Sequence, residues 1–317
     1  MLLPVKLSEL RETLAKYNIR PSKKLGQNFL HDSNQVKKII HVADLAPTDK
    51  VIEIGPGLGA LTHELIQAAG LVVAIEYDSR LVKALEEIFG CQAINLDSFL
   101  GSYGMNLPPS LNGRNLLLLE GDALTFLERF NQGMENWKVI SNLPYSIASP
   151  ILVELAQGTR SPQKIVVTVQ LEVAQRITAS PNHEQYGLLT VLLGVDFESR
   201  IAFRIPPSCF YPAPEVHSAC VVLERRSNPL VPDHLKPLFK NLIKLSFSQR
   251  RKKMFKLLAK ELPSDIVIQA FKRVGISPDV RAEQVSVVDF ASLTNDIANQ
   301  LYLDNTSSYA NRTPNCS

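Results

Sequence analysis

The chain has 317 residues, of which 45% are hydrophobic and 21% are charged, and its net charge is +3. This length allows one large domain and a smaller one, and the composition excludes a chain too polar to bury a core. A charge of +3 is too small to indicate nucleic-acid binding by itself, so an argument for RNA depends on where the positive charges lie.

The N-terminus and the cysteines exclude further classes of protein. Residues 1–14 predict an amphipathic helix with Leu3, Leu7, Leu10 and Leu14 on one side, and not a signal peptide. No stretch of about twenty apolar residues is present, so we expect no membrane span. The four cysteines form no C-x-x-C pair, so we expect neither a disulfide framework nor a metal site. A cytoplasmic protein with reduced thiols is the simplest interpretation.

From Val51 onward, short β-branched runs alternate with helical patterns. A helix is expected to about Ala69 and another over 79–89. The predicted strands cover 51–54, 71–75, 116–119, 138–140 and 165–169. This alternation predicts a doubly wound, Rossmann-like α/β domain, whose parallel sheet is covered by helices on both faces. Ligands in such a fold lie beyond the carboxyl ends of the strands.

Two segments depart from this pattern. Residues 92–115 are rich in Gly and Pro and are long for a link between a helix and a strand, so we interpret them as a surface insertion. After Arg226 the predicted helices cover 233–247, 250–260, 265–274 and 287–301. We therefore expect an α/β domain over 1–228, a small helical domain over 229–303 and a disordered polar tail over 304–317.

The first predicted strand leads into a glycine-rich turn at 53–59, EIGPGLG. Glycine lets the backbone turn sharply and lets a ligand approach closely, so Gly55 and Gly57 are candidate cofactor contacts. Glu76 ends the second strand, where a carboxylate can accept hydrogen bonds from both hydroxyls of a ribose. The dinucleotide pattern is G-x-G-x-x-G, whereas this chain has G-x-G-x-G and lacks the backbone N–H of Pro56. The turn therefore favours S-adenosylmethionine, which has no phosphates, over a nicotinamide dinucleotide.

Gly121 and Asp122 end the third predicted strand. Asp122 can accept a hydrogen bond from the adenine amine of a cofactor, but it can equally cap the helix that follows. Both interpretations stay open at this point. Asp97, in the insertion, has no predicted strand end beneath it and is set aside.

The fourth predicted strand is followed by Asn142, Leu143, Pro144 and Tyr145. Methylation of an adenine amine is difficult because the nitrogen lone pair is delocalised into the ring. The side-chain oxygen of Asn142 and a neighbouring backbone carbonyl can both accept from the NH₂ and so favour a pyramidal nitrogen. Pro144 stiffens the loop, and Tyr145 offers a face on which a base can stack. The alternative is an ordinary turn after a strand, and the cofactor motifs in the same chain favour the catalytic interpretation.

In combination, these motifs resemble the KsgA/RsmA family of ribosomal RNA adenine dimethyltransferases over about residues 24–293. The resemblance extends to an N-terminal motif at 25–30, LGQNFL. Further matching signatures lie at 170–176, 210–216, 247–252 and 275–283. The resemblance implies S-adenosylmethionine as cofactor, with contacts from Asn28, Leu30, Gly55, Glu76, Asp122 and Asn142.

The resemblance also implies a substrate and its binding mode. Tyr145 and Phe210 would hold a flipped adenine between aromatic faces, close to Asn142. The alternative for Phe210 is that its Pro-rich loop simply packs against the sheet. The family's substrate is two adjacent adenines in the loop of the last small-subunit rRNA helix, and each receives two methyl groups during late assembly of the subunit. We therefore expect a monomer whose partner is small-subunit rRNA.

Positive charge recurs in the predicted helical domain. Lysines at four-residue spacing lie beside an apolar stripe on its first helix, and a basic run follows that helix. Like charges at this spacing mildly destabilise an isolated helix, so the pattern favours an anionic partner over a merely solvated face. The candidate RNA contacts are Lys236, Lys240, Lys244, Arg250, Arg251 and Lys252.

Two alternatives of function remain. A methyltransferase that modifies adenine in large-subunit rRNA would have nearly the same site, but the C-terminal signatures argue against it. A non-catalytic RNA- or DNA-binding factor on the same fold is the second alternative. The intact sequence from Asn142 to Tyr145 argues against pure binding.

Overall fold

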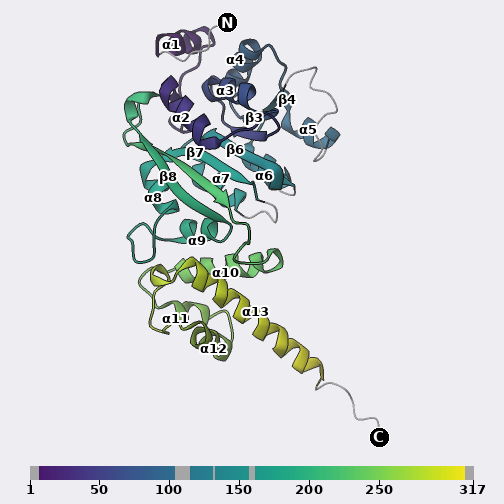
Figure 1. Cartoon of the computed structure of the whole chain (residues 1–317), viewed down its shortest axis with the longest axis vertical. Helices are drawn as coiled ribbons and strands as arrows, with labels where there is room; N and C mark the ends of the chain where they lie inside the picture. Colours follow the sequence, from purple (N-terminus) through teal and green to yellow (C-terminus); the bar gives the residue numbers. More distant parts are fainter. Residues whose placement is uncertain (1–6, 104–114, 131–132, 157–160, 311–317) are drawn as a thin grey trace. The chain divides into compact units, whose positions relative to one another are not determined.

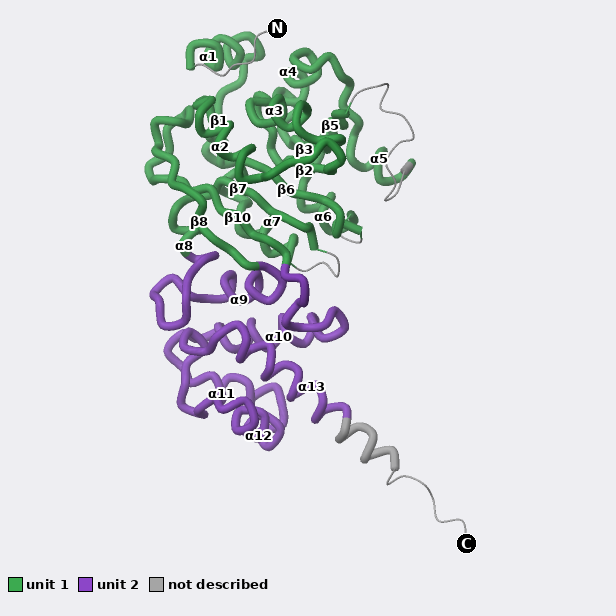
Figure 2. The backbone as a smooth tube through the Cα atoms, viewed as in Figure 1, with its two compact units in different colours: residues 1–175, 198–225 green, residues 176–197, 226–317 purple. Residues whose placement is uncertain are grey.

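The computed structural model of the protein describes residues 7–103, 115–130, 133–156 and 161–310, of which 103 and 303–310 are described by their backbone alone. The chain divides into two compact units (Figure 2). Unit 1 comprises residues 1–175 and 198–225, and unit 2 comprises residues 176–197 and 226–317. None of the described helices has the length and apolarity needed to cross a membrane.

Unit 1 is built on an eight-stranded sheet in the order β4-β5-β3-β2-β6-β7-β10-β8 (Figure 1). Its strands are β2 (Lys50–Ile54), β3 (Leu71–Glu76), β4 (Ile94–Asn95), β5 (Leu116–Glu120), β6 (Trp137–Asn142), β7 (Lys164–Gln170), β8 (Phe197–Ile205) and β10 (Ser218–Arg225). The strands from β4 to β7 in this order pair in parallel, as the alternating pattern predicts. The Rossmann-like α/β class is thereby confirmed.

One strand contradicts the expectation of a wholly parallel sheet. Strand β10 pairs antiparallel with β7, with Ser218 opposite Gln170 and Glu224 opposite Lys164. Residues 218–223 of β10 are all buried, on both faces of the strand. A strand buried on both faces has the same apolar run in either direction, so its composition could not reveal its orientation.

Helices cover both faces of the sheet. On one face, α2, α3 and α4 contribute Ile39, Leu65 and Leu85 to a single apolar cluster with strand residues such as Val72. The neighbouring strand residue Val73, which points to the opposite face, is also buried, so that face is covered as well. The helices of unit 1 include α2 (Ser33–Ala43), α3 (Ala60–Ala68), α4 (Ser79–Phe89), α6 (Ala123–Phe130) and α7 (Ala148–Leu155).

The segment interpreted as a surface insertion begins with regular structure. Strand β4 lies at the edge of the sheet beside β5, and α5 (Leu96–Tyr103) follows it. Asp97 therefore does follow a strand end, contrary to the expectation. Its side chain is 82% exposed and lies 3.9 Å from Arg129, and it does not line the cavity described below. The rest of the segment, 104–114, lies outside the described residues.

A two-stranded sheet joins two motifs that are far apart in the sequence. Strand β1 (Phe29–Leu30) pairs antiparallel with β9 (Phe210–Tyr211), with Leu30 opposite Phe210. The N-terminal helix α1 (Leu7–Lys16) buries Leu10 and Leu14 as predicted, in a cluster that includes Phe29. Leu3, expected on the same helix, lies outside the described residues. The N-terminal motif is thus held by both a strand partner and an apolar cluster.

Unit 2 is helical, but its boundary differs from the expected one at 228/229. Residues 176–197 belong to it, and they contain α9, an apolar helix with five consecutive buried residues over 189–193. The side chain of Lys236 on α10 forms an ion pair of 3.0 Å with Asp196. Local patterns could not predict this assignment because the partners lie about forty residues apart. The helices are α9 (Leu188–Gly194), α10 (Lys236–Phe247), α11 (Met254–Leu258), α12 (Ser264–Val274) and α13 (Val287–Ala310).

The last helix also differs from its expected end. Helix α13 was predicted to end at Leu301 but continues to Ala310. Residues 304–310 of the predicted disordered tail are therefore helical. The remaining residues of that tail, 311–317, lie outside the described part of the chain.

The start of α2 yields a prediction about stability. The Asp32 side chain accepts hydrogen bonds from the backbone N–H groups of Asn34 and Gln35, at 2.9 and 3.0 Å. We expect Asp32→Ala to lower the free energy of unfolding by about 1 kcal/mol, because these donors lose their cap. Asp32→Asn keeps an acceptor and is the matched control. Chemical unfolding of both variants checks this, and equal stability of the two would contradict a capping role.

Candidate active site

A cavity of about 280 Å³ lies at the carboxyl ends of the central strands. Strand β2 has β3 on one side and β6 on the other, so the strand order reverses here, and such switch points are where ligands bind in open α/β sheets. Among the lining residues are all those predicted to hold the cofactor and three of the five predicted for catalysis, with Asn142 in both sets: Asn28, Leu30, Gly55, Gly57, Glu76, Asp122, Asn142, Leu143 and Pro144. The structure therefore brings together motifs that the sequence distributes over more than one hundred residues.

The glycine-rich turn lies so close to two other motifs that its glycines leave no room for a side chain. Gly55 has φ +67°, and a Cβ there would lie 3.0 Å from Cγ of Pro144. Gly57 has φ +62°, and a Cβ there would lie 2.9 Å from Cδ1 of Phe29. Both positions need glycine for its backbone conformation and for this close approach. The turn, the loop after β6 and strand β1 thus form one tightly packed wall of the cavity.

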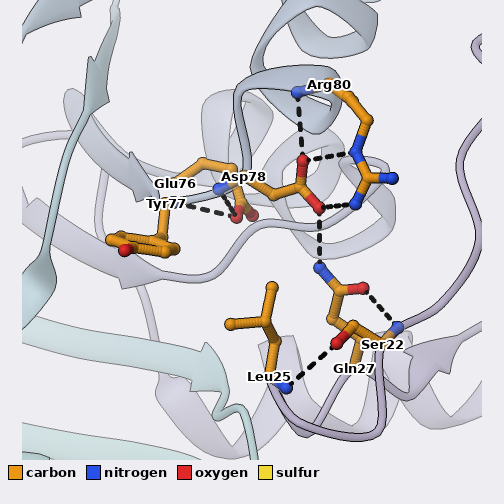
Figure 3. A network of polar contacts seen from close by, with 7 residues as sticks. All are labelled: Ser22, Leu25, Gln27, Glu76, Tyr77, Asp78 and Arg80. Carbon is orange, nitrogen blue, oxygen red and sulfur yellow. Dashed lines mark hydrogen bonds and ion pairs between the residues drawn. The ribbon is translucent and has the colours of Figure 1, made fainter.

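Glu76 lies at the end of β3 with its carboxylate held by backbone donors (Figure 3). Its Oε1 accepts from the N–H groups of Tyr77 and Asp78, both at 2.9 Å, and its Oε2 accepts from Gly57 at 3.2 Å. Burial raises the pKa of Glu76 to about 7, against the lowering effect of these hydrogen bonds. A carboxylate has about four acceptor positions, so capacity remains for a ribose hydroxyl.

Asp122 fulfils one of its two interpretations and is compatible with the other. Its Oδ1 accepts from the backbone N–H of Leu124 at 2.9 Å, so it caps the start of α6. The residue is also exposed and lines the cavity. Helix capping therefore holds this aspartate in position beside the cavity, and the two roles do not exclude each other.

Glu53 is a cavity residue that the sequence analysis did not single out. Its side chain is 1% exposed, and its Oε2 has no hydrogen-bond partner among the described residues. Burial raises the pKa of Glu53 to about 8. The available signal was a carboxylate inside an apolar strand, next to a glycine turn, since buried acids with shifted pKa values concentrate at functional sites.

The amide of Asn142 has a defined orientation. Its Nδ2 donates to the backbone carbonyl oxygen of Asn28 at 3.0 Å. A carbonyl can only accept, so the NH₂ group must face Asn28 and the oxygen must face the other way. The Oδ1 atom is buried and has no hydrogen-bond partner in the described part of the chain. An unpaired buried acceptor beside a cavity calls for a donor from a ligand.

Tyr145 and Phe210, the two aromatic residues predicted to hold a base, are brought together. Their ring centroids lie 6.4 Å apart with an interplanar angle of 66°, in an edge-to-face contact. The hydroxyl of Tyr145 hydrogen-bonds to the Ser218 hydroxyl. Phe210 is only 2% exposed and belongs to the apolar cluster under α2, so the packing interpretation describes it in this structure. No face of Phe210 is open to a base in this arrangement.

Lys236 does not present its charge at an open surface, in contrast to its expected role. Its side chain is 10% exposed and lies 3.0 Å from Asp196 and 2.9 Å from Asp233. The Asp196 side chain is 2% exposed, so this pair is largely buried. Lys240 is half-buried, whereas Lys244 is exposed. The regular spacing of these lysines therefore places them in different environments.

The basic run after α10 is exposed, but its first residue is held in place. Arg250 donates from Nε to Glu283 at 3.0 Å and from Nη2 to the carbonyl oxygen of Glu184 at 2.8 Å. Arg251 and Lys252 are exposed. The predicted helix over 250–260 begins only at Met254, so this run forms a turn before α11.

The α/β sheet, the glycine turn, the buried acid at the end of β3 and the asparagine at the end of β6 together fit an S-adenosylmethionine-dependent methyltransferase. The chain matches the family described as ribosomal RNA adenine dimethylase over residues 18–299. The chain therefore belongs to the ribosomal RNA adenine dimethylase family. This membership confirms the predicted resemblance, enzyme class and cofactor.

Similar proteins agree with this membership. The ribosomal RNA small subunit methyltransferase A of Pelotomaculum thermopropionicum is 37% identical over 298 residues, which cover 90% of this chain and 94% of that protein. The protein of the same name from Clostridium perfringens is 34% identical over 297 residues, with 92% and 96% covered.

Solved structures show the same fold. A dimethyladenosine transferase from Plasmodium falciparum has a TM-score of 0.63 at 22% identity and covers 84% of this chain and 96% of its own. The 23S rRNA methyltransferase ErmE has a TM-score of 0.60 at 24% identity, with 86% and 100% covered.

The raised pKa of Glu76 yields a prediction about pH. Below about pH 7 the carboxyl takes up a proton and loses its charge and part of its capacity to accept hydrogen bonds. We expect the affinity for S-adenosylmethionine to rise with pH from about 6 to about 8, by up to about tenfold per unit at the acidic end. Glu76→Gln should bind more weakly and with a flatter profile. Calorimetric titration at several pH values checks this.

The control for this experiment is Glu53→Gln. Glu53 lines the same cavity and also titrates, with a pKa of about 8. Its replacement should leave the dependence at the acidic end in place. An unchanged acidic slope in Glu76→Gln would mean that another group carries the effect.

Proposed function

We propose that this enzyme dimethylates the exocyclic amines of two adjacent adenosines in the loop of the 3′-terminal helix of 16S rRNA, within an assembling small subunit. The support is family membership together with relatives named for the small subunit, of which the matched region covers almost the whole length. The observation that carries the chemistry is the unpaired, buried Oδ1 of Asn142. We expect the enzyme to act as a monomer in the cytoplasm, where ribosomal subunits assemble.

The cavity fits S-adenosylmethionine. Glu76 would hold the ribose, Asp122 the adenine amine, and Asn28, Leu30 and the glycine turn the remainder of the molecule. The turn leaves no room for Cβ atoms at Gly55 and Gly57. When bound there, the cofactor supplies a methyl group activated by positive charge on sulfur.

Asn142 orients the acceptor. Its Oδ1 and the carbonyl oxygen of Leu143 would accept the two N–H bonds of the target amine, which favours a pyramidal nitrogen over a planar, conjugated one. Because Asn28 already holds the amide NH₂, this orientation exists before substrate arrives and needs no reorganisation. Fixed orientation of this kind can lower a barrier by roughly 7–11 kcal/mol.

The chain needs no strong base for this reaction. The methylated amine is a very strong acid and loses a proton readily to water, and the two oxygens stabilise the positive charge as it develops. Tyr145 would stack on the base with its ring fixed by the Ser218 hydroxyl. Phe210 would contribute as support behind Tyr145, since its own faces are buried.

We expect Asn142→Ala to abolish methyl transfer while RNA binding survives, because the variant removes the acceptor oxygen but no positive charge. The measurement is transfer of labelled methyl groups to unmethylated small subunits, with the modified nucleotides mapped by mass spectrometry. Asn142→Asp is the informative comparison, because it keeps an acceptor oxygen but loses the N–H that donates to Asn28.

The same mapping discriminates between substrates. Labelled adenines at another site, or in large-subunit rRNA, would contradict the proposed target. Substantial remaining transfer by Asn142→Ala would refute the role of the amide. An absence of transfer by the wild-type chain on both subunits would favour a binding factor.

The exposed basic residues of unit 2 would contact RNA phosphates. We expect Lys244→Glu and Arg251→Glu each to lower the slope of log affinity against log salt by about 0.7–0.9, since each phosphate contact releases one counterion. Titration of RNA at several salt concentrations checks this.

Lys236→Gln is the matched control, because Lys236 is committed to a buried ion pair. It should leave the salt slope unchanged and lower the free energy of unfolding by about 3 kcal/mol. If the slope of log affinity against log salt became flatter in Lys236→Gln but not in Lys244→Glu or Arg251→Glu, the surface that binds RNA would lie elsewhere.

A further inference from the structure

Residues 22–28 form a compact segment beside the donor cavity, here called the strap. Its turn is closed by hydrogen bonds from the Gln27 N–H to the Ser22 carbonyl at 3.2 Å and from the Leu25 N–H to the Ser22 hydroxyl at 3.3 Å. Residues 25–28 all line the cavity. The strap is therefore a wall of the cavity made from a turn, and its position depends on how it is attached.

One attachment of the strap leads to the catalytic loop. The carbonyl oxygen of Gly26 accepts from the Tyr145 N–H at 3.4 Å, and that of Asn28 accepts from Nδ2 of Asn142 at 3.0 Å. A Cβ on Gly26 would lie 2.6 Å from the backbone nitrogen of Ser146, so the two segments are in direct contact. Any displacement of the strap would thus move the group that orients Asn142.

The other attachment is the side chain of Gln27 (Figure 3). Its Oε1 accepts from the Ser22 N–H at 2.8 Å, and its Nε2 donates to Oδ2 of Asp78 at 3.2 Å. Gln27 therefore joins the strap to the end of β3, two residues beyond Glu76. Its amide uses both its acceptor and its donor, one toward each side.

Asp78 is a rigid anchor for this contact. Its side chain is 5% exposed and forms two hydrogen bonds with the Arg80 guanidinium, at 3.0 and 2.7 Å. It also accepts from the Arg80 N–H at the start of α4, and its own N–H donates to Glu76. The Arg80 guanidinium holds the pKa of Asp78 below its usual range, so the anchor is a carboxylate.

We propose that Gln27 is a positioning residue, whose bond to Asp78 holds the strap over the donor cavity and couples the Glu76 end of the cavity to Asn142. Donor bound between these two ends is retained as long as the hydrogen bond from Gln27 to Asp78, here called the latch, is formed. Loss of the latch lets the strap swing away from β3, so donor dissociates faster and Asn142 loses its fixed orientation. The inference rests on the donor-binding part of the proposed function and not on the identity of the RNA.

An isosteric exchange tests the latch. Gln27→Glu places two carboxylates opposite each other, and Asp78→Asn removes the charge and one of the acceptor oxygens that Gln27 and Arg80 share. Each single variant should raise the dissociation constant for S-adenosylmethionine by about tenfold or more, because the hydrogen bond to a charged group is lost. The double variant restores a donor–acceptor pair with its direction reversed and the same net charge, and it should recover most of the affinity.

Calorimetry with S-adenosylmethionine alone makes this test independent of the RNA substrate. Gln92→Glu, which adds the same charge at an exposed position outside the cavity, is the control and should bind as the wild type does. Gln27→Asn is a neutral variant too short to reach both partners, and it should weaken binding even if the charged variants fail to fold. In the wild type, bound donor should also slow hydrogen exchange at the backbone amides of residues 25–28. In Gln27→Asn, donor should slow this exchange much less.

The outcomes separate positioning from mere stability. Lower unfolding midpoints with unchanged donor affinity would overturn the proposal. So would a double variant whose loss of affinity equals the sum of the two single losses, because the two side chains would then act independently. Recovery of donor affinity in the double variant supports it.

Discussion

The hydrogen bond from the Asn142 amide nitrogen to the Asn28 carbonyl decides which atom of this amide is left for a ligand, namely its oxygen. An amide turned the other way would direct N–H donors at an amine, which also carries N–H donors, and no productive contact would form. The Asn28 carbonyl is itself held because the next residues form β1, which pairs with β9. Phe210, predicted as a base-stacking residue, instead lies opposite Leu30 in this strand pair and so helps to support the segment that carries Asn28.

The same cavity holds two carboxyl groups whose pKa values burial raises. Burial raises the pKa of Glu53 to about 8 and that of Glu76 to about 7, so near neutrality the cavity carries less negative charge than its composition suggests. A cationic ligand favours the ionised forms, and a neutral one does not. We therefore expect a donor with a positively charged sulfur to favour the ionised carboxylates more strongly than its thioether product does. Rigid backbone donors at Glu76 keep its carboxylate in place throughout.

The sequence predicted those parts of the site that follow strand ends. Gly55, Glu76, Asp122 and Asn142 each lie within three residues of the end of a predicted strand, and parallel strands bring such ends to one edge. What it could not predict was partner choice over long distances. The assignment of α9 to unit 2, the antiparallel direction of β10 and the bond of Gln27 to Asp78 each depend on a contact between residues that no local pattern connects.

The basic helix of unit 2 illustrates the same limit for function. Lys236 and Lys244 belong to one regular pattern, yet one neutralises the nearly inaccessible Asp196 and the other faces solvent. The repulsion expected between like charges along that helix is reduced where a lysine has its own acidic partners. Charge spacing therefore overstates the surface available to RNA, and burial decides which lysines remain for it. In the basic turn, Arg250 pairs with Glu283, whereas Arg251 and Lys252 are exposed and keep their charge at the surface.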